Sequence, residues 1–187
     1  MKEINSLKKN IENNQPSNLE AEQALLGSIL KPYRHELIIA TKAGLKDFGS
    51  PPDFNAAAVE ASVGKSLRHF QSDYIDILQL HNPSAYDLLE NESLLKLLEQ
   101  MRRDGKIRAV GLSLKSPCEA LPLTQLVQPD TLQMNLNLLD HRAIEDGILD
   151  WALAEGIGVI ARTPLCFGFL SGEINDQSTF SPNESTT

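Results

Sequence analysis

The sequence has few of the residues that build disulfide frameworks and metal sites. Its 187 residues include two cysteines, Cys118 and Cys166, which are far apart and form no Cys-x-x-Cys pair. None of the four histidines has metal-ligand spacing relative to another. The scarcity of cysteine favours a reducing compartment. The sequence therefore predicts a cytoplasmic protein without a metal centre or a disulfide.

Long apolar runs and an excess of positive charge are also absent. No apolar run reaches the roughly 18–20 residues that cross a membrane, and the N-terminus lacks the apolar segment of a signal peptide. Lys and Arg number 17 against 25 Asp and Glu, which gives a net charge of −8. Nucleic-acid binding needs a basic face. Neither a membrane nor a nucleic acid is therefore expected as a partner.

Two nucleotide-binding fingerprints are missing as well. No Gly-x-Gly-x-x-Gly follows a predicted strand, and no Gly-x-x-x-x-Gly-Lys-Ser/Thr occurs anywhere. The first absence excludes a Rossmann fingerprint and the second excludes a P-loop nucleotidase.

What the chain does contain is an alternation of short apolar segments with segments of helical period. Hydrophobic residues make up 41% of the chain, enough for one packed domain. The predicted strands are residues 36–41, 74–80, 107–112, 131–136 and 157–161. The predicted helices between them are residues 55–70, 86–103, 117–127 and 143–155. Because strands alternate with helices and are apolar throughout, an α/β fold with a covered parallel sheet is predicted.

Two of the predicted strands deliver a polar side chain to their C-terminal ends. Residues 72–83 carry His81 at the end of an apolar run, and residues 36–44 carry Lys42 in the same place. In a barrel of parallel strands, the C-terminal strand ends face the active site. Taken singly, such a histidine is more often structural and such a lysine is usually solvated. Together they predict a functional site.

Five segments, in order and at the right spacing, resemble the aldo-keto reductases over residues 34–172. The resemblance implies a (β/α)₈ barrel, of which this chain would hold an incomplete part with about five parallel strands and outer helices. It also implies hydride transfer between NADP(H) and a small carbonyl substrate, which the sequence does not identify. The segments are 39–42 (Ile-Ala-Thr-Lys), 72–81, 105–113, 132–139 and 158–165.

The resemblance also assigns roles to residues. Lys42 matches the lysine that lowers the pKa of a catalytic tyrosine, and His81 matches the histidine that orients the carbonyl. Ser113 and Gln133 match positions that hydrogen-bond the nicotinamide carboxamide. The loop where the nicotinamide ring stacks and the diphosphate lies is matched by Arg162, Thr163 and Leu165.

Several departures from the family pattern affect the expected activity. The catalytic tyrosine and the aspartate that pairs the lysine have no counterpart, because no Asp-Thr-Ala-x-x-Tyr-Gly segment occurs. Tyr33 and Tyr74 stand in other contexts. The family's first and eighth strands have no match, and Leu114 replaces a common asparagine. We therefore expect a truncated, inactive chain whose NADP(H) binding is weak or lost.

The N-terminal residues have a different resemblance. Residues 15–30 resemble the start of the N-terminal domain of bacterial replicative DNA helicases, and Ser17 and Glu20 fit a capping box for a helix over 18–30. The alternative is a capped amphipathic helix of no special origin. This predicts a tail and unrelated helix over 1–33, a partial barrel over 34–172 and a disordered tail over 173–187. A natural fusion, a hybrid reading frame and an artefact all fit this pattern.

An incomplete barrel would leave two sheet edges unpaired. The predicted edges are the strands at 36–41 and 157–161, both of them apolar. Unpaired apolar edges pair with other chains. The sequence therefore also supports a non-catalytic alternative, in which the fragment associates with itself or acts as an interaction module.

Overall fold

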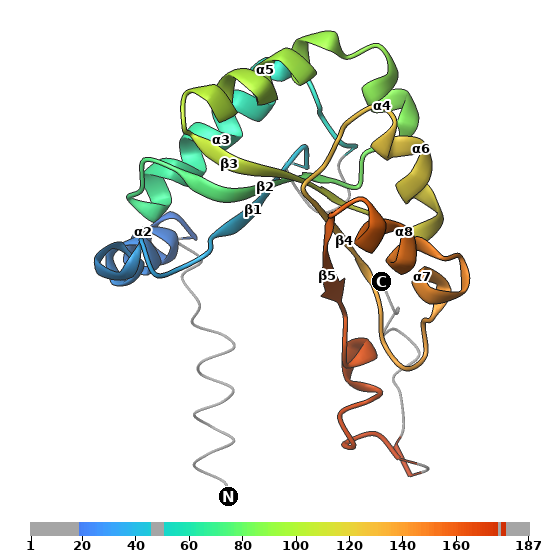
Figure 1. Ribbon diagram of the computed structural model, residues 1–187. Coiled ribbons are helices and arrows are strands. Elements are labelled where there is room, and N and C mark those ends of the chain that lie inside the picture. Colours follow the sequence, from blue (N-terminus) through green and yellow to red (C-terminus); the bar gives the residue numbers. More distant parts are fainter. Residues whose placement is uncertain (1–18, 46–50, 176, 179–187) are drawn as a thin grey trace, which may run out of the picture.

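A computed structural model describes residues 19–45, 51–175 and 177–178, and it shows one parallel sheet with helices along it (Figure 1). The sheet has five strands in the order β1-β2-β3-β4-β5, so neighbours in sequence are neighbours in space. The strands are β1 (Ala40–Ala43), β2 (Ile75–His81), β3 (Ile107–Ser113), β4 (Thr131–Asn135) and β5 (Gly158–Arg162). The predicted fold class, an α/β arrangement that forms part of a barrel, is confirmed.

The helices α3 to α8 follow the sheet in an arc along one of its faces (Figure 1). Before the sheet come α2 (Leu19–Leu30) and η1 (Lys31–Tyr33). The helices that follow are α3 (Ala56–Phe70), α4 (Ala85–Leu89), α5 (Glu92–Arg103), η2 (Pro117–Glu119), α6 (Ala120–Thr124), α7 (Arg142–Glu145), α8 (Ile148–Ala154) and η3 (Cys166–Gly168). None of the helices in the described residues is long and apolar enough to cross a membrane.

Two predicted helices are each divided in the structure, and local residues explain both breaks. The helix predicted over 86–103 is split into α4 and α5, because the Asn91 side chain accepts a hydrogen bond from the Leu94 N–H and caps a new helix. The helix predicted over 143–155 is split into α7 and α8 at Gly147, whose φ is 68°. A left-handed residue of this kind cannot continue a right-handed helix.

The strand predicted over residues 36–41 begins at Ala40 instead. Side chains form hydrogen bonds with backbone groups that would otherwise pair with the neighbouring strand. The Asp76 carboxylate accepts from the Ile39 N–H at 2.9 Å, and the Arg34 guanidinium donates to the Leu37 carbonyl at 3.0 Å. Lys42 is the penultimate residue of β1, so it lies at the C-terminal end of this strand as expected, although the strand ends at Ala43 rather than at residue 41.

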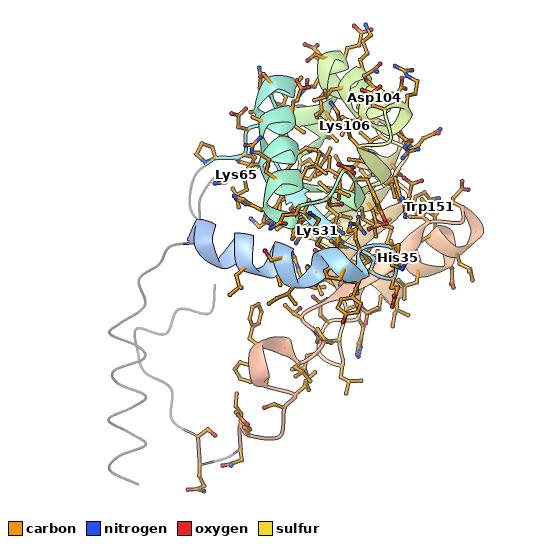
Figure 2. The ribbon with its side chains drawn as sticks, turned by 90° about the vertical axis from the view of Figure 1, so that its left-hand side faces the viewer. Lys31, His35, Lys65, Asp104, Lys106 and Trp151 are labelled. Atoms are coloured by element: carbon orange, nitrogen blue, oxygen red, sulfur yellow. The ribbon has the colours of Figure 1, made fainter. Side chains whose placement is uncertain are left out.

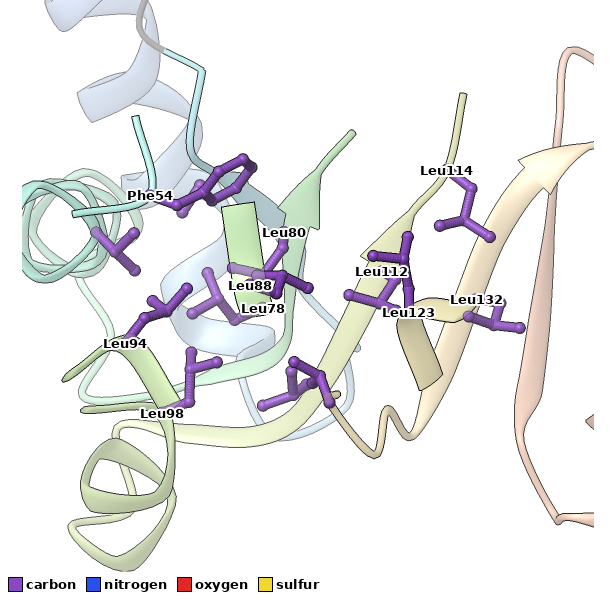
Figure 3. Close-up of a cluster of buried hydrophobic side chains, with 14 of the residues drawn as sticks. Phe54, Leu78, Leu80, Leu88, Leu94, Leu98, Leu112, Leu114, Leu123 and Leu132 are labelled. Atoms are coloured by element: carbon purple, nitrogen blue, oxygen red, sulfur yellow. The ribbon is translucent and has the colours of Figure 1, made fainter. Parts of the chain in front are cut away.

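The hydrophobic core lies between the sheet and the helices (Figure 3). Side chains alternate between the two faces of a strand, and Leu78, Leu80, Leu112 and Leu132 on the helix-facing side are fully buried. Each buried leucine side chain contributes roughly 1.5–3 kcal/mol relative to exposure. The helices supply the facing residues Leu88, Leu94, Leu98 and Leu123, and the loop before α3 supplies Phe54. This packing fixes which residues remain for the opposite face of the sheet.

Helix α2 packs on the end of α3 (Figure 2). Gly27 makes the close approach possible. A Cβ at this position would overlap the His69 carbonyl oxygen, so only glycine fits without a shift. Elsewhere on this helix Ser28 accepts a hydrogen bond from Gln71, while the apolar side chains of Leu25 and Ile29 are 63% and 58% accessible. The predicted capping box begins at Ser17, which lies outside the described residues.

Candidate functional site

The polar residues singled out in the sequence lie on the sheet face opposite the helices. Strand alternation places Lys42, His81, Ser113 and Gln133 on this side, which we call the inner face, together with Gln79, which the sequence analysis did not select. The strand register joins them, because Lys42 is opposite Gln79, His81 is opposite Ser113, and Ser113 is opposite Gln133. Residues far apart in sequence therefore form one continuous polar surface.

Arg162 completes the inner face from the far side of the sheet. It lies opposite Asn135 in the register of β4 and β5. Its Nε donates to Asn135 Oδ1 at 2.8 Å, and its Nη2 donates to the Leu114 carbonyl at 3.0 Å. The guanidinium is thus held in one position rather than free in solvent.

The basic groups of the inner face act on one another across the sheet. Burial, together with the charges of Lys42 and Arg162, holds the pKa of His81 below its usual 6.5. Burial and the charge of Arg162 likewise lower the pKa of Lys42 from 10.5. Since like charges disfavour protonation, His81 is a neutral imidazole at neutral pH. A neutral imidazole can donate one hydrogen bond and accept another.

Ser113 and Gln133 form a pair at the ends of β3 and β4. Ser113 is fully buried, and its hydroxyl donates to Gln133 Oε1 at 3.3 Å. This bond uses the amide oxygen of Gln133 and leaves the amide N–H groups as donors. The pair can therefore offer N–H and hydroxyl groups to a planar amide in front of it.

The backbone after β5 is strained at a β-branched residue. Thr163 has a φ of 53°, which is a genuine outlier for threonine. Its hydroxyl donates to the Arg162 carbonyl at 2.7 Å and lies 3.2 Å from Asn135 Oδ1, and its carbonyl accepts from Asn137 Nδ2 at 3.0 Å. Strain of this kind persists only where neighbouring groups hold it.

Asn135 and Asn137 were not predicted from the sequence. Asn135 holds both Arg162 and Thr163, and Asn137 holds the Thr163 carbonyl. The signal was available, because Asn135 is a polar residue at a strand end, which is the criterion that selected His81.

Leu165 is the predicted site residue that the structure does not bring to the inner face. It is 56% exposed in the turn before η3. The next two residues, Cys166 and Phe167, have φ values of 46° and 55°, and the Phe167 side chain is 68% exposed. This loop presents apolar groups to solvent rather than packing them against the strand ends.

No tyrosine stands beside Lys42, although all three tyrosines of the chain are described. Tyr33 and Tyr86 are 56% and 90% exposed on helical segments. The Tyr74 ring lies between two guanidinium groups, 3.7 Å from Arg34 and 3.8 Å from Arg108. Tyr74 precedes β2, so it is at the opposite end of that strand from His81. The phenol that the lysine would activate is therefore missing.

Comparison with known proteins places this arrangement in one family. Residues 18–187 match the aldo/keto reductase family. Aldo-keto reductase YhdN of Bacillus subtilis is 32% identical over 164 residues, which cover 84% of this chain and 48% of that protein. The chain thus spans about half the length of the curated relatives it matches.

Solved structures of aldo/keto reductases resemble this fold as well. The holo form of aldo-keto reductase AKR11C1 from Bacillus halodurans is 27% identical with a TM-score of 0.72, covering 90% of this chain and 56% of that one. An aldo/keto reductase from Klebsiella pneumoniae, solved with NADP, shares the fold at 24% identity and a TM-score of 0.63, covering 81% of this chain and 51% of that one.

The match bears on the N-terminal helix as well. It begins at residue 18, so it includes α2, which the sequence analysis separated from the barrel. The resemblance of residues 15–30 to replicative helicases finds no support in these comparisons. The family match, the identity to YhdN and the inner-face geometry lead to the same conclusion: the chain belongs to the aldo/keto reductase family.

Proposed function

We propose that this chain carries the nicotinamide end of an NADP(H) site and a carbonyl-orienting histidine, but does not reduce carbonyl compounds by itself. One observation supports both halves of the proposal. Lys42, His81, Ser113 and Gln133 share the inner face, while all three tyrosines lie elsewhere.

The residues present fit one end of the cofactor. The hydroxyl of Ser113 and the amide of Gln133 suit the nicotinamide carboxamide, which offers one acceptor and two donors. Arg162 is fixed at the end of β5, where its charge suits a diphosphate. When bound, NADPH would supply the hydride. Relatives of this family bind NADP(H), which favours this cofactor.

The remaining inner-face residues can position a carbonyl group but cannot protonate it efficiently. His81 is neutral, so its N–H can donate to a carbonyl oxygen. The charge of Lys42 would favour ionisation of a neighbouring phenol, but no phenol is there. The site therefore supports binding and orientation rather than turnover.

Fluorescence titration with NADPH tests the binding half of the proposal. We expect weak binding, reduced by about tenfold in Gln133→Ala, because one amide that pairs with the carboxamide is lost. Gln128→Ala is the matched control, since Gln128 is exposed outside the inner face. Absence of any NADPH binding, or equal binding by Gln133→Ala and the unmodified chain, would contradict the proposal.

The outer strands of the sheet favour self-association, which we propose as a second, non-catalytic property. Among the described residues, β1 and β5 each pair along one edge only. Ile38 before β1 is 78% exposed, and Phe167 after β5 is 68% exposed. Unpaired strand edges flanked by apolar side chains bind other chains. We also propose that the protein is cytoplasmic, and we expect it to self-associate there.

Sedimentation velocity over a range of protein concentrations measures this property. We expect the weight-average mass to rise with concentration, and Ile38→Lys to reduce the rise, because an edge lysine opposes strand pairing. Tyr86→Lys is the control, since Tyr86 is 90% exposed on α4. A monomer at every concentration would refute self-association.

A further inference from the structure

We propose that residues 1–18, which lie outside the described residues, fold back as a second helix onto the exposed side of α2. The surface of α2 is thus a docking site for a segment of the chain itself. This goes beyond the cofactor site and the unpaired strand edges, because it concerns only α2 and the residues that lead into it. Four features of this region carry the inference.

The first feature is an apolar side of α2 that no described residue covers. Helix α2 packs on α3 through Gly27, where a Cβ would overlap the His69 carbonyl oxygen. Two positions along an α-helix correspond to about 200° of rotation, so Leu25 and Ile29 lie on the side away from α3. Their side chains are 63% and 58% exposed, and Leu26 beside them is 46% exposed. Single exposed apolar residues are ordinary, whereas a cluster of them marks a contact surface.

The second feature is the way the chain enters α2. Residues 1–18 connect directly to Leu19, where α2 begins, and the family match starts only at residue 18. Residues 14–18 (Asn-Gln-Pro-Ser-Asn) are typical of a turn. Pro16 disfavours helical backbone at the residue before it, and connections of about 2–5 residues join antiparallel helices. The segment is therefore tethered beside α2 by a connection of suitable length and composition.

The third feature is the hydrophobic pattern of the segment. Ile4, Leu7 and Ile11 are the apolar residues between positions 2 and 14, and their spacing of three and four residues places them on one side of a helix. An isolated helix shorter than about 12–15 residues is marginal in water. This stripe therefore stabilises a helix over residues 3–13 only when it is buried against another apolar surface.

The fourth feature is the register of the two stripes. Leu7 and Leu25 are equidistant from Pro16 in the sequence, and Ile4 is within one residue of the position equidistant with Ile29. A helix that turns back at Pro16 therefore brings apolar residues of the segment beside the exposed apolar residues of α2. Helices in such pairs bury their apolar stripes against one another.

The tether favours this segment over a second copy of the chain as the occupant. A short connection gives an attached segment an effective concentration in the millimolar range. A second copy in dilute solution is present at a far lower concentration. Charge favours the same antiparallel pairing, because Lys9 comes within one residue of the position opposite Glu22.

Hydrogen–deuterium exchange, followed by mass spectrometry on the full chain at low and high protein concentration, tests the proposal. A synthetic peptide of residues 1–18 provides the exchange rates of the undocked segment. We expect the amides of residues 3–13 to exchange at least about tenfold more slowly in the chain than in the peptide. The protection should be the same at both concentrations, because the contact lies within one molecule.

Leu25→Asp is the decisive variant, since it leaves the sequence of the segment unchanged. It should abolish the protection of residues 3–13, because the contact would bury an unpaired charge, whereas Leu25→Met should retain it. The matched control is Leu153→Asp on α8, where the side chain is 81% exposed. Protection of β2, measured in the same experiment, shows whether each variant is folded. Leu7→Asp, which changes no described residue, gives the same test if Leu25→Asp does not fold.

Three results would overturn the proposal. The first is exchange of residues 3–13 at the rates of the free peptide. The second is protection that survives both Leu25→Asp and Leu7→Asp. The third is protection that appears only at high protein concentration, which would show that a second copy covers α2. None of these variants changes the inner face, so the outcome is separate from that of the NADPH titration.

Discussion

The purified chain is expected to leave NADPH unconsumed when mixed with a reactive aldehyde such as 4-nitrobenzaldehyde. Carbonyl reduction needs a proton donor beside the developing alkoxide, and a positioned general acid contributes about 10²–10⁴-fold. Lys42 has no tyrosine to activate, because Tyr33, Tyr74 and Tyr86 all lie away from the inner face. NADPH absorbance, followed over time, measures the rate.

Two variants show whether any residual activity comes from this site. If a slow background rate is seen, Lys42→Ala and His81→Ala should leave it unchanged, because neither residue would be taking part in a catalysed reaction. The opposite result is informative. Consumption of NADPH by the unmodified chain that both substitutions abolish would refute the proposed inactivity and would show that another group supplies the proton.

Replacement of Asp76 by alanine is expected to destabilise the fold by about 3–5 kcal/mol, the usual cost of removing one partner of a buried ion pair. Asp76 is 7% exposed and binds Arg34 at 2.7 Å and Arg108 at 3.0 Å. Arg34 is itself 8% exposed, so its charge would remain buried and unpaired. The Ile39 N–H would also lose its acceptor. Urea denaturation at low protein concentration measures the free energy of unfolding.

The free energy of unfolding should also depend on pH through the ionisation of Asp76. Burial opposes ionisation of Asp76, but the Ile39 N–H and the guanidinium groups of Arg34 and Arg108 outweigh it and hold its pKa below the usual 3.8. Because the folded-state pKa is the lower one, the stabilisation is complete above the unfolded-state pKa of about 3.9. It is lost as the pH falls below that value and through the folded-state pKa.

Glu92→Ala provides the matched comparison. Glu92 pairs with Lys96 at 2.7 Å on the exposed surface of α5, where ion pairs contribute little. We expect almost no change in stability for this variant. A loss of less than about 1 kcal/mol for Asp76→Ala, within the range of ordinary surface substitutions, would show that the buried network does not hold the start of β1 in place.

The sequence by itself predicted the order of the elements and which polar residues lie at the ends of the strands. Apolar segments alternating with helical periods predicted five parallel strands, because these patterns are local properties of the chain. The same strands placed His81 and Ser113 at their C-terminal ends, and strand alternation then decides the face on which each lies. These features needed no knowledge of distant contacts.

The tertiary structure decided what depends on distant partners. The start of β1 at Ala40 follows from the Asp76 carboxylate, which is far from it in sequence. The fixed position of Arg162 depends on Asn135 in the neighbouring strand. The lowered pKa of Lys42 likewise depends on burial by the fold and on the charge of Arg162, which belongs to a strand far away in the sequence. A local pattern records which side chain is present, whereas its hydrogen-bond partner and its electrostatic environment are set by segments that the fold brings together.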